Sequence, residues 1–390
     1  MDFDFSDDQQ SLRDAVRRWV DKGFPFGRRH ALAKAGGATR AVYGELAELG
    51  LTGLAIPEAH GGMGFGAVEA MVVNEELGRG LVNAPYAHAA LVAPALLASA
   101  PAALQSAWLP RMASAEALVV LAHQERAARY RLEHVSTRAM RQGDRQGDRQ
   151  GDRQHVGWAL EGAKSIVPAG DEADAYIVPA RLSGAVDDRA GIGLFLVERA
   201  ALAARQLRGY PTQDGSRAAE IRLAGTPAAL IALDGHAALE GAVDIGIAAL
   251  CAEAVGVMDR LVELTVEYMN TRKQFGVPIA TFQALRHRIA DVKMQLELGR
   301  SMSYFATLKL GEPGPQRRRA VSQARVQLGQ SMRFVGQQCV QLHGGVGVTD
   351  EYQGSHYFKR LTVLEMVFGD TQHHLGEVAA RMQDSAGVFA

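Results

Sequence analysis

The stretch YMNTRKQFGVPIATFQ, residues 268–283, decides how the rest of the sequence is interpreted. Residues up to Thr271 continue a helical apolar pattern, a turn containing glycine and proline follows, and a second helical pattern begins at its end. The turn carries a basic residue, Arg272, and an aromatic residue, Phe275. The stretch therefore predicts a corner between two helices that presents a cation and an aromatic ring.

Helical patterns extend from this corner in both directions. Apolar residues recur at spacings of three and four, which places them on one face of each helix. A last helix is expected to carry Leu361, Leu364, Leu375 and Met382. These periods predict a bundle of four helices over residues 235–390. The other apolar positions of the bundle are Ile245, Ala248, Ala252, Val255, Val262, Val266, Met269, Leu285, Ile289, Val292, Leu296, Val321, Ala324, Leu328, Met332, Val335, Cys339 and Leu342.

The middle of the chain, residues 114–234, has a different period. Short runs rich in β-branched residues, such as 192–197, are bounded by glycine, proline and aspartate, and apolar and polar residues alternate over 219–223. Strands without long intervening helices favour a sandwich or barrel over a doubly wound parallel sheet. Residues 141–154 repeat Arg-Gln-Gly-Asp without one apolar residue, so we expect a solvated loop there.

The helical pattern of residues 1–113 completes a three-part layout. Ser6 and Gln9 stand at the spacing of a capping box, which predicts the start of the first helix. The chain is therefore expected to be α+β, with an N-terminal helical domain, a middle β-barrel domain at 114–234 and a C-terminal four-helix bundle at 235–390.

The composition excludes several classes of protein. The 390 residues carry 42 Lys and Arg against 43 Asp and Glu, so no global positive field exists to hold nucleic acid or an anionic membrane. Cys251 and Cys339 cannot form a disulfide framework, which suits a reducing cytoplasm. The first ten residues contain four aspartates, so we expect no signal or transit peptide. We expect the most apolar stretch to be Ala87 to Leu104, which is broken by prolines and falls short of the roughly 20 apolar residues of a membrane span.

Three stretches resemble known functional motifs but lack residues that those motifs require. The run GMGFG at 62–66 lacks the Lys-Ser/Thr of a phosphate loop. The HGG at 343–345 resembles an esterase oxyanion loop, yet no G-x-S-x-G elbow accompanies it. His373 and His374 are adjacent and would point to different sides of a helix, and no H-E-x-x-H motif exists, so we expect no metal site.

The corner at Arg272 to Gln283 closely resembles the R-x-x-F-G-x-x-I-x-x-x-Q motif of the acyl-CoA dehydrogenase family. Other landmarks of that family occur in order along essentially the whole chain, and the helix, barrel and helix plan of the family matches the layout above. These landmarks are LGL at 49–51, IPE followed by GG within 56–62, G-x-K at 162–164, AD at 173–174, AR at 180–181 and Q-x-HGG-x-G at 341–347.

The resemblance implies that FAD lies between the β domain and the bundle, that its adenine end reaches a neighbouring subunit, and that the substrate is an acyl-CoA thioester. Carried over by position, Arg272 would contact the pyrophosphate as a bidentate donor. Phe275 would pack near the adenine, and Gln341 with Gly345 would contact it from the partner chain. The further implied cofactor residues are Gln274 and Gln283 in the corner, Gln124 and Glu125 at the family's threonine-glutamate pair beside the flavin ring, and Pro168 and Thr371.

The catalytic base is where the sequence departs from the family. The implied α,β-dehydrogenation needs a carboxylate that removes the α proton while hydride passes from the β carbon to the flavin. The family's two glutamate positions are occupied by Gly369 and Gly246. Asp370 and Asp244 are the nearest carboxylates, and each is either a base or an ordinary helix-end or surface acid. Because a missing general base costs about 10²–10⁴ in rate, we do not expect a self-sufficient catalyst.

Three further positions depart from the family pattern. Ile166 stands where a tryptophan often covers the flavin, and Pro168 stands where a hydroxyl would reach the flavin N5. Ile247 replaces a family arginine on the substrate side.

These departures favour a resemblance to the small subunit of a two-component acyl-CoA dehydrogenase, such as that of pimeloyl-CoA dehydrogenase, whose large subunit would supply the base. The segments 209–215 and 368–375 look like that subgroup. Two alternatives stay open, a self-sufficient homo-oligomer that uses Asp370 or Asp244 and a flavin-binding structural subunit without an active site. Electrons would leave through a separate electron-accepting flavoprotein, because no Rossmann fingerprint for NAD exists.

Overall fold

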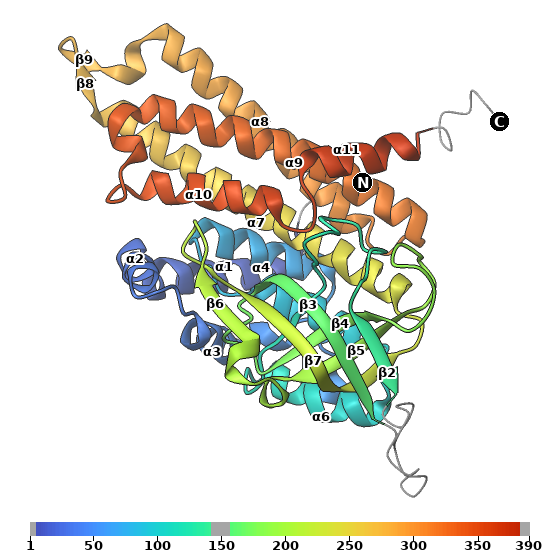
Figure 1. Ribbon diagram of the computed structural model, residues 1–390. Coiled ribbons are helices and arrows are strands. Elements are labelled where there is room, and N and C mark those ends of the chain that lie inside the picture. Colours follow the sequence, from blue (N-terminus) through green and yellow to red (C-terminus); the bar gives the residue numbers. More distant parts are fainter. Residues whose placement is uncertain (1–4, 142–156, 383–390) are drawn as a thin grey trace, which may run out of the picture. The chain divides into compact units, whose positions relative to one another are not determined.

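The computed structural model describes residues 5–141 and 157–382, so all but the first residue of the Arg-Gln-Gly-Asp repeat lies outside the described residues. Helices come first, strands follow, and helices close the chain (Figure 1), which confirms the predicted fold class. The predicted boundaries at 113/114 and 234/235 stay a prediction, because packing divides the chain into two compact units that mix these segments. The first unit is Met1–Leu32, Ala67–Val82 and Ile247–Ala390, and the second is Ala33–Gly66 and Asn83–Gly246.

The N-terminal segment is helical, as predicted. The Ser6 side chain accepts a hydrogen bond from the Gln9 backbone N at 3.3 Å and the Gln9 side chain accepts one from the Ser6 N at 3.1 Å, so the predicted capping box is confirmed. The helices are α1 (Asp7–Gly23), α2 (Phe26–Lys34), α3 (Arg40–Glu48), α4 (Ala67–Arg79), α5 (Ala93–Leu97) and α6 (Ala102–Ala113), with a π-helical turn, η3 (Ala87–Val92).

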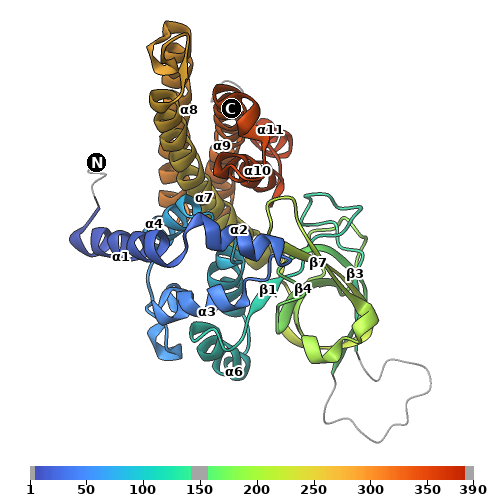
Figure 2. The same cartoon turned by 90° about the vertical axis from the view of Figure 1, so that its left-hand side faces the viewer.

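In the described part of the chain, five strands close into a barrel. Strand β4 pairs with β5, β5 with β7, β7 with β3, β3 with β2, and β2 returns to β4 through one residue pair. Figure 2 shows the ring that these strands form. The predicted alternation over 219–223 is confirmed, because Ala219, Ile221 and Leu223 are buried and the residues between them are not. The strands are β1 (Val119–Leu121), β2 (Arg138–Arg141), β3 (Trp158–Pro168), β4 (Ala175–Arg181), β5 (Ile192–Glu198), β6 (Leu207–Pro211) and β7 (Arg217–Ala232).

The C-terminal helices depart from the prediction at the end of the chain. The expected last helix is two helices, because Phe368 and Gly369 adopt positive φ values of 59° and 121° and break it. Such backbone cannot continue a right-handed helix. Met382 lies beyond the second of them. The helices are α7 (His236–Thr271), α8 (Gln283–Leu308), α9 (Gly314–His343), α10 (Gln353–Met366) and α11 (Thr371–Ala380).

Helix α7 corrects the expectation about the most apolar stretch. By length and composition it could cross a membrane, with a mean hydropathy of 1.7 over its most apolar window, whereas Ala87–Leu104 could not. However, 89% of that window is buried within the protein, as in the core helix of a globular fold, so it is weak evidence for a membrane span.

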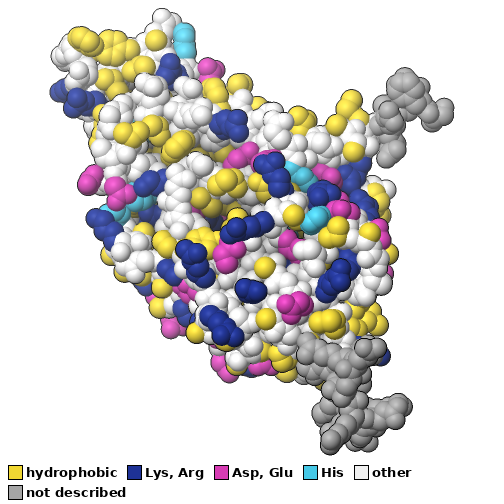
Figure 3. Space-filling model, viewed as in Figure 1, with side chains coloured by type: hydrophobic (Ala, Val, Ile, Leu, Met, Phe, Trp, Pro, Cys, Tyr) yellow, Lys and Arg dark blue, Asp and Glu magenta, His cyan; other side chains and the backbone are white. Residues whose placement is uncertain are grey.

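On the face shown in Figure 3, Lys and Arg side chains are scattered among acidic and neutral ones.

Helices α4 and α7 cross in direct backbone contact within the first unit. A Cβ added at Gly256 would lie less than 3.0 Å from the Glu75 carbonyl oxygen, and one added at Gly78 would lie equally close to the Glu253 carbonyl. Real Cβ atoms essentially never approach so closely, so both positions require glycine at this helix separation.

Candidate functional site

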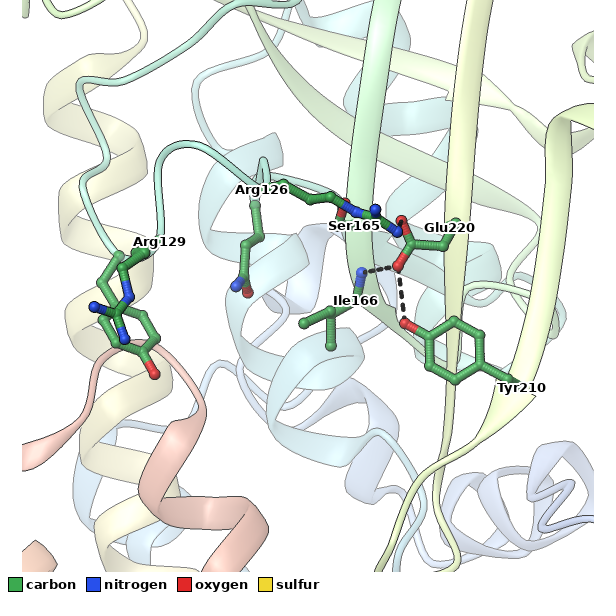
Figure 4. Close-up of a pocket in the computed structure, with 8 residues that line it drawn as sticks. Arg126, Arg129, Ser165, Ile166, Tyr210 and Glu220 are labelled. Carbon is green, nitrogen blue, oxygen red and sulfur yellow. Dashed lines mark hydrogen bonds and ion pairs between the residues drawn. The ribbon is translucent and has the colours of Figure 1, made fainter.

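A pocket of about 390 Å³ opens on the barrel in the second unit (Figure 4). It lies beside the loop that follows β1 and beside a bulge in β3. The bulge lies between Lys164 and Val167, where Ile166 adopts φ 52° and is 50% exposed. The lining residues are Gln124, Arg126, Arg129, Tyr130, Ser165, Ile166, Tyr210 and Glu220.

Two of the lining residues are positions that the sequence singled out. Gln124 was expected beside the flavin ring, and Ile166 stands where the family often has a tryptophan. The Ser165 backbone N donates to the Gln124 carbonyl oxygen at 2.8 Å, which fixes the loop against the bulge. The structure therefore brings these two positions together, while their contacts with a flavin stay a prediction.

Glu125 follows Gln124 in the chain, and its side chain points into the barrel. Its carboxylate is 4% exposed and turned into the chain, where it accepts hydrogen bonds from Lys164 Nζ at 2.7 Å, from the Thr137 hydroxyl at 2.7 Å and from the Ser136 backbone N at 2.8 Å. Burial alone would raise its pKa, but the Lys164 charge and these donors hold the pKa at about 2. This carboxylate is engaged inside the barrel, and a contact of Glu125 with the flavin stays a prediction.

A polar cluster on strands β6 and β7, beside the bulge in β3, was not predicted from the sequence. The Glu220 carboxylate accepts a hydrogen bond from the Tyr210 hydroxyl at 3.1 Å and one from the Ile166 backbone N at 3.4 Å, and Arg126 approaches it at 3.8 Å (Figure 4). Burial and the Glu220 charge raise the pKa of Tyr210 to about 12, so this hydroxyl remains a donor at neutral pH. The polar half of the alternation over 219–223 was the available signal.

The predicted corner is confirmed as a turn between helices α7 and α8, with a short hairpin inside it. Strands β8 (Lys273–Gln274) and β9 (Val277–Pro278) pair, and Phe275 sits at the tip with φ 54° and 92% of its surface exposed. Arg272 is exposed beside it. Gln274 and Gln283 are exposed as well.

A small apolar cluster joins this corner to the end of α9. It consists of Met269, Ile279 and Leu342, with Phe282 packed against it. Gln341 precedes Leu342 in the chain, Gly345 lies three residues after it, and both are exposed. The structure therefore brings the predicted adenine-end residues to one end of the first unit, while their roles stay a prediction.

The usual base position at residue 369 is filled by histidine rings. A Cβ added at Gly369 would lie 2.5 Å from His374 Nε2 and 2.7 Å from His373 Cδ2, and its φ of 121° belongs to glycine. His374 is fully buried and accepts or donates at Ser322 Oγ and the Phe368 carbonyl, both at 3.2 Å. Burial lowers the pKa of His374 well below its ordinary value, so the ring is neutral.

The residues next to this position act in helix capping. Asp370 is the N-cap of α11, and its Oδ1 accepts from the His373 backbone N at 2.8 Å. Thr371 donates its backbone N at 3.0 Å and its hydroxyl at 2.6 Å to Glu365 Oε1, which occupies the hydroxyl expected at the cofactor. Arg325, which is fully buried, donates to the Gly369 carbonyl at 3.2 Å and fixes the segment.

Asp244 does not lie on the same side of α7 as Gly246, the second base position of the family. Asp244 is fully buried in α7 and Gly246 is buried two residues later. Two residues correspond to about 200° of rotation on an α-helix, so the two positions face nearly opposite sides of α7. Pro168 ends β3 opposite Ala218 and does not line the pocket.

Three potential metal ligands of the first unit meet at His30, Asp350 and His356. Arg29 contacts His356 Nδ1, and the Asp350 carbonyl is 2.7 Å from His356 Nε2, so the ring accepts from the arginine and donates through Nε2. Lys359 Nζ lies 3.0 Å from Asp350 Oδ1. Two cations in contact with the group indicate an ion-pair cluster instead of a metal centre.

Comparisons with known proteins cover nearly the whole chain. The description "Acyl-CoA dehydrogenase, N-terminal domain" matches residues 6–116, and "Acyl-CoA dehydrogenase, C-terminal domain" matches residues 234–383. The acyl-CoA dehydrogenase IpdE2 of Mycobacterium tuberculosis is 30% identical over 356 residues, 91% of each chain.

Two other similar proteins differ in extent. (2S)-Methylsuccinyl-CoA dehydrogenase of Cereibacter sphaeroides is 25% identical over 357 residues, which are 87% of this chain and 63% of that relative's length. The solved ChsE4–ChsE5 complex from Mycobacterium tuberculosis gives a TM-score of 0.84 at 25% identity and covers 99% of this chain and 100% of that chain.

Proposed function

The chain belongs to the acyl-CoA dehydrogenase family, and from this premise we propose that it serves FAD-dependent α,β-dehydrogenation of an acyl-CoA thioester as the small subunit of a two-component enzyme. A dicarboxylic acyl group such as pimeloyl is our proposed substrate, on the basis of segments 209–215 and 368–375. A large-subunit acyl-CoA dehydrogenase is the proposed partner, a separate flavoprotein the proposed electron acceptor, and the cytoplasm the proposed location.

The state of the base position is the observation that carries the two-component proposal. Residue 369 has neither a carboxylate nor the space for one, since His374 occupies the volume that a longer side chain needs. The Asp370 carboxylate caps the first turn of α11. Asp244 faces away from the side of α7 that Gly246 presents. We therefore assign the base to a second chain.

The residues that remain fit the dinucleotide of this family. Arg272 is exposed, and no ion pair engages it among the residues that the structure describes, so its guanidinium is available to a pyrophosphate. The exposed ring of Phe275 offers a face for an adenine or a neighbouring chain. The pocket supplies Ser165 and Gln124 at the other proposed end.

In this assignment FAD supplies the acceptor for hydride, and this chain's task is to bind and orient. Arg272 would hold the pyrophosphate and Gln124 would contact the ring. The buried Glu125–Lys164 pair holds the loop that carries Gln124, because it ties that loop to β3. The solved ChsE4–ChsE5 complex, which contains two named chains, supports an assembly of two different subunits.

The test is to purify the chain alone and together with its large subunit, and to follow bleaching of bound flavin and turnover with pimeloyl-CoA and an artificial electron acceptor. We expect bound FAD in the complex and turnover only there. Turnover by the lone chain that Asp370→Asn or Asp244→Asn abolishes would show a self-sufficient homo-oligomer. FAD that no acyl-CoA bleaches, alone or in the complex, would show a structural subunit.

A second test restores the glutamate directly. We expect Gly369→Glu in the lone chain to give no turnover, because the new side chain collides with His374 and the backbone strains at φ 121°. Turnover regained by this single substitution would contradict the closed position described here.

A further inference from the structure

We propose that the barrel pocket is an anion-binding site in which Arg129 contacts a phosphate or carboxylate group of the bound ligand. The ligand's identity rests on the proposed function, whereas the anion site rests on the geometry of the pocket alone. Neither Arg129 nor a cation at its position belongs to the cofactor residues considered above.

The charges around the pocket leave Arg129 unmatched. Arg126 has Glu220 at 3.8 Å, and Arg131, two residues further, pairs with Asp187 at 2.9 Å. For Arg129 no ion pair or hydrogen bond of the side chain occurs within residues 5–141 and 157–382. Figure 4 shows it on the other side of the pocket from Glu220. The pocket wall therefore carries two arginines and one carboxylate, an excess of one positive charge.

The backbone of Arg129 supports a functional reason for this charge. Its φ of 49° lies in the left-handed region, which a residue with a Cβ adopts at a cost of about 1 kcal/mol. Glycine would hold this turn without strain. Strained positions that persist at a pocket wall point to a role for their side chain, and here that side chain is an unmatched guanidinium.

Arginine is suited to such a role because its planar fork binds carboxylate and phosphate oxygens through two parallel hydrogen bonds. Hydroxyl donors at Tyr130 and Ser165 and the amide of Gln124 line the same pocket. Two sources of the anion are compatible with this chemistry, the phosphates of the flavin dinucleotide and the phosphates or distal carboxylate of the acyl-CoA.

The experiment uses Arg129→Gln, Arg129→Lys and Arg129→Gly in the purified protein with any partner that accompanies it, and Arg131→Gln as the matched control. Dissociation constants are measured for FAD and riboflavin, and for pimeloyl-CoA, pimeloyl-pantetheine and heptanoyl-CoA. We expect Arg129→Gln to weaken one anionic ligand by roughly 10- to 100-fold, Arg129→Lys to weaken it less, and Arg131→Gln to leave all affinities unchanged.

The pattern across ligands identifies the anion. Weaker FAD binding with unchanged riboflavin assigns a cofactor phosphate. Weaker pimeloyl-CoA and heptanoyl-CoA with unchanged pimeloyl-pantetheine assigns a coenzyme A phosphate, and loss confined to the two pimeloyl ligands assigns the distal carboxylate. Unchanged affinities throughout, or an equal loss for riboflavin and FAD, would overturn the proposal.

Arg129→Gly adds a readout that a structural role would not give. Removing the strain at φ 49° should raise the thermal midpoint of unfolding while the affinity for the anionic ligand falls. A fall in both would show that Arg129 stabilises the loop instead of a ligand. Because binding is measured and not turnover, a chain without dehydrogenase activity would refute the proposed function without touching this result.

Discussion

The buried pair of Glu125 and Lys164 gives the sharpest test of how the pocket loop is held. Lys164 is fully buried, and its only other hydrogen-bond acceptor within the described chain is the His123 carbonyl at 3.5 Å. Glu125 keeps its Ser136 and Thr137 donors if the lysine is removed. Both Lys164→Met and Glu125→Gln leave one buried charge without its opposite charge, and each should lower the free energy of unfolding of the barrel by about 3–5 kcal/mol.

The two single substitutions should differ in a way that the hydrogen bonds dictate. Glu125→Gln leaves the Lys164 ammonium without an opposite charge and turns an amide, with one acceptor oxygen in place of two, toward the Ser136 and Thr137 donors. Lys164→Met leaves a carboxylate that keeps four hydrogen bonds, so Glu125→Gln should cost more. The double variant Glu125→Gln/Lys164→Met should cost less than the sum of the two, because neither charge remains. Glu116→Gln, which removes an exposed pair with Arg111, should cost less than about 1 kcal/mol.

The assay is native-state hydrogen exchange of the barrel amides, which measures the barrel without assuming that the whole chain unfolds in one step. The pH dependence has a definite sign. The pKa of Glu125 falls from 4.5 to about 2 on folding, so its stabilisation is complete above about pH 4.5 and is lost as the pH drops towards 2. A cost for Lys164→Met no greater than that of Glu116→Gln would refute the reasoning.

Three further predictions concern the helices and the corner. Gly256→Ala should destabilise the chain by about 1–3 kcal/mol, because its Cβ meets a carbonyl of α4, whereas Gly376→Ala, with nothing within 4 Å, should stabilise α11 by about 0.5–1 kcal/mol; thermal unfolding of both variants checks the difference. Burial lowers the pKa of His374, so below its ordinary pKa of 6.5 the unfolded chain takes up a proton at this ring before the folded chain does, and stability should decline as the pH falls. His374→Gln should flatten that decline in denaturant titrations at several pH values. Arg272→Gln should weaken FAD by roughly 10- to 100-fold without changing the unfolding midpoint, and equal binding by variant and parent would count against the pyrophosphate assignment.

Local patterns in the sequence were sufficient for much of the fold. The capping box at Ser6, the alternation over 219–223 and the helical periods depend on neighbours within a few residues, and the structure confirms them. The break between α10 and α11 was missed, although Gly369 followed by Asp370 is the usual signal for the end of one helix and the N-cap of the next.

The candidate site was only partly predictable for a related reason. Gln124 and Ile166 were found because each stands at a family landmark. Tyr210 and Glu220 were missed because their meeting depends on the register between β6 and β7, which places residues ten apart on neighbouring strands. The true partners of Glu125 were missed because Lys164 lies 39 positions away in the chain.

The histidine packed against Gly369 has a consequence for the history of this chain. A glutamate at residue 369 is unusable until the ring of His374 is removed and the backbone leaves φ 121°, while removing the ring first opens a hole in the core without any gain. Neither substitution is useful by itself, so each order of the two steps passes through a weakened protein. The dependence on a partner that we propose is therefore protected against reversal one mutation at a time.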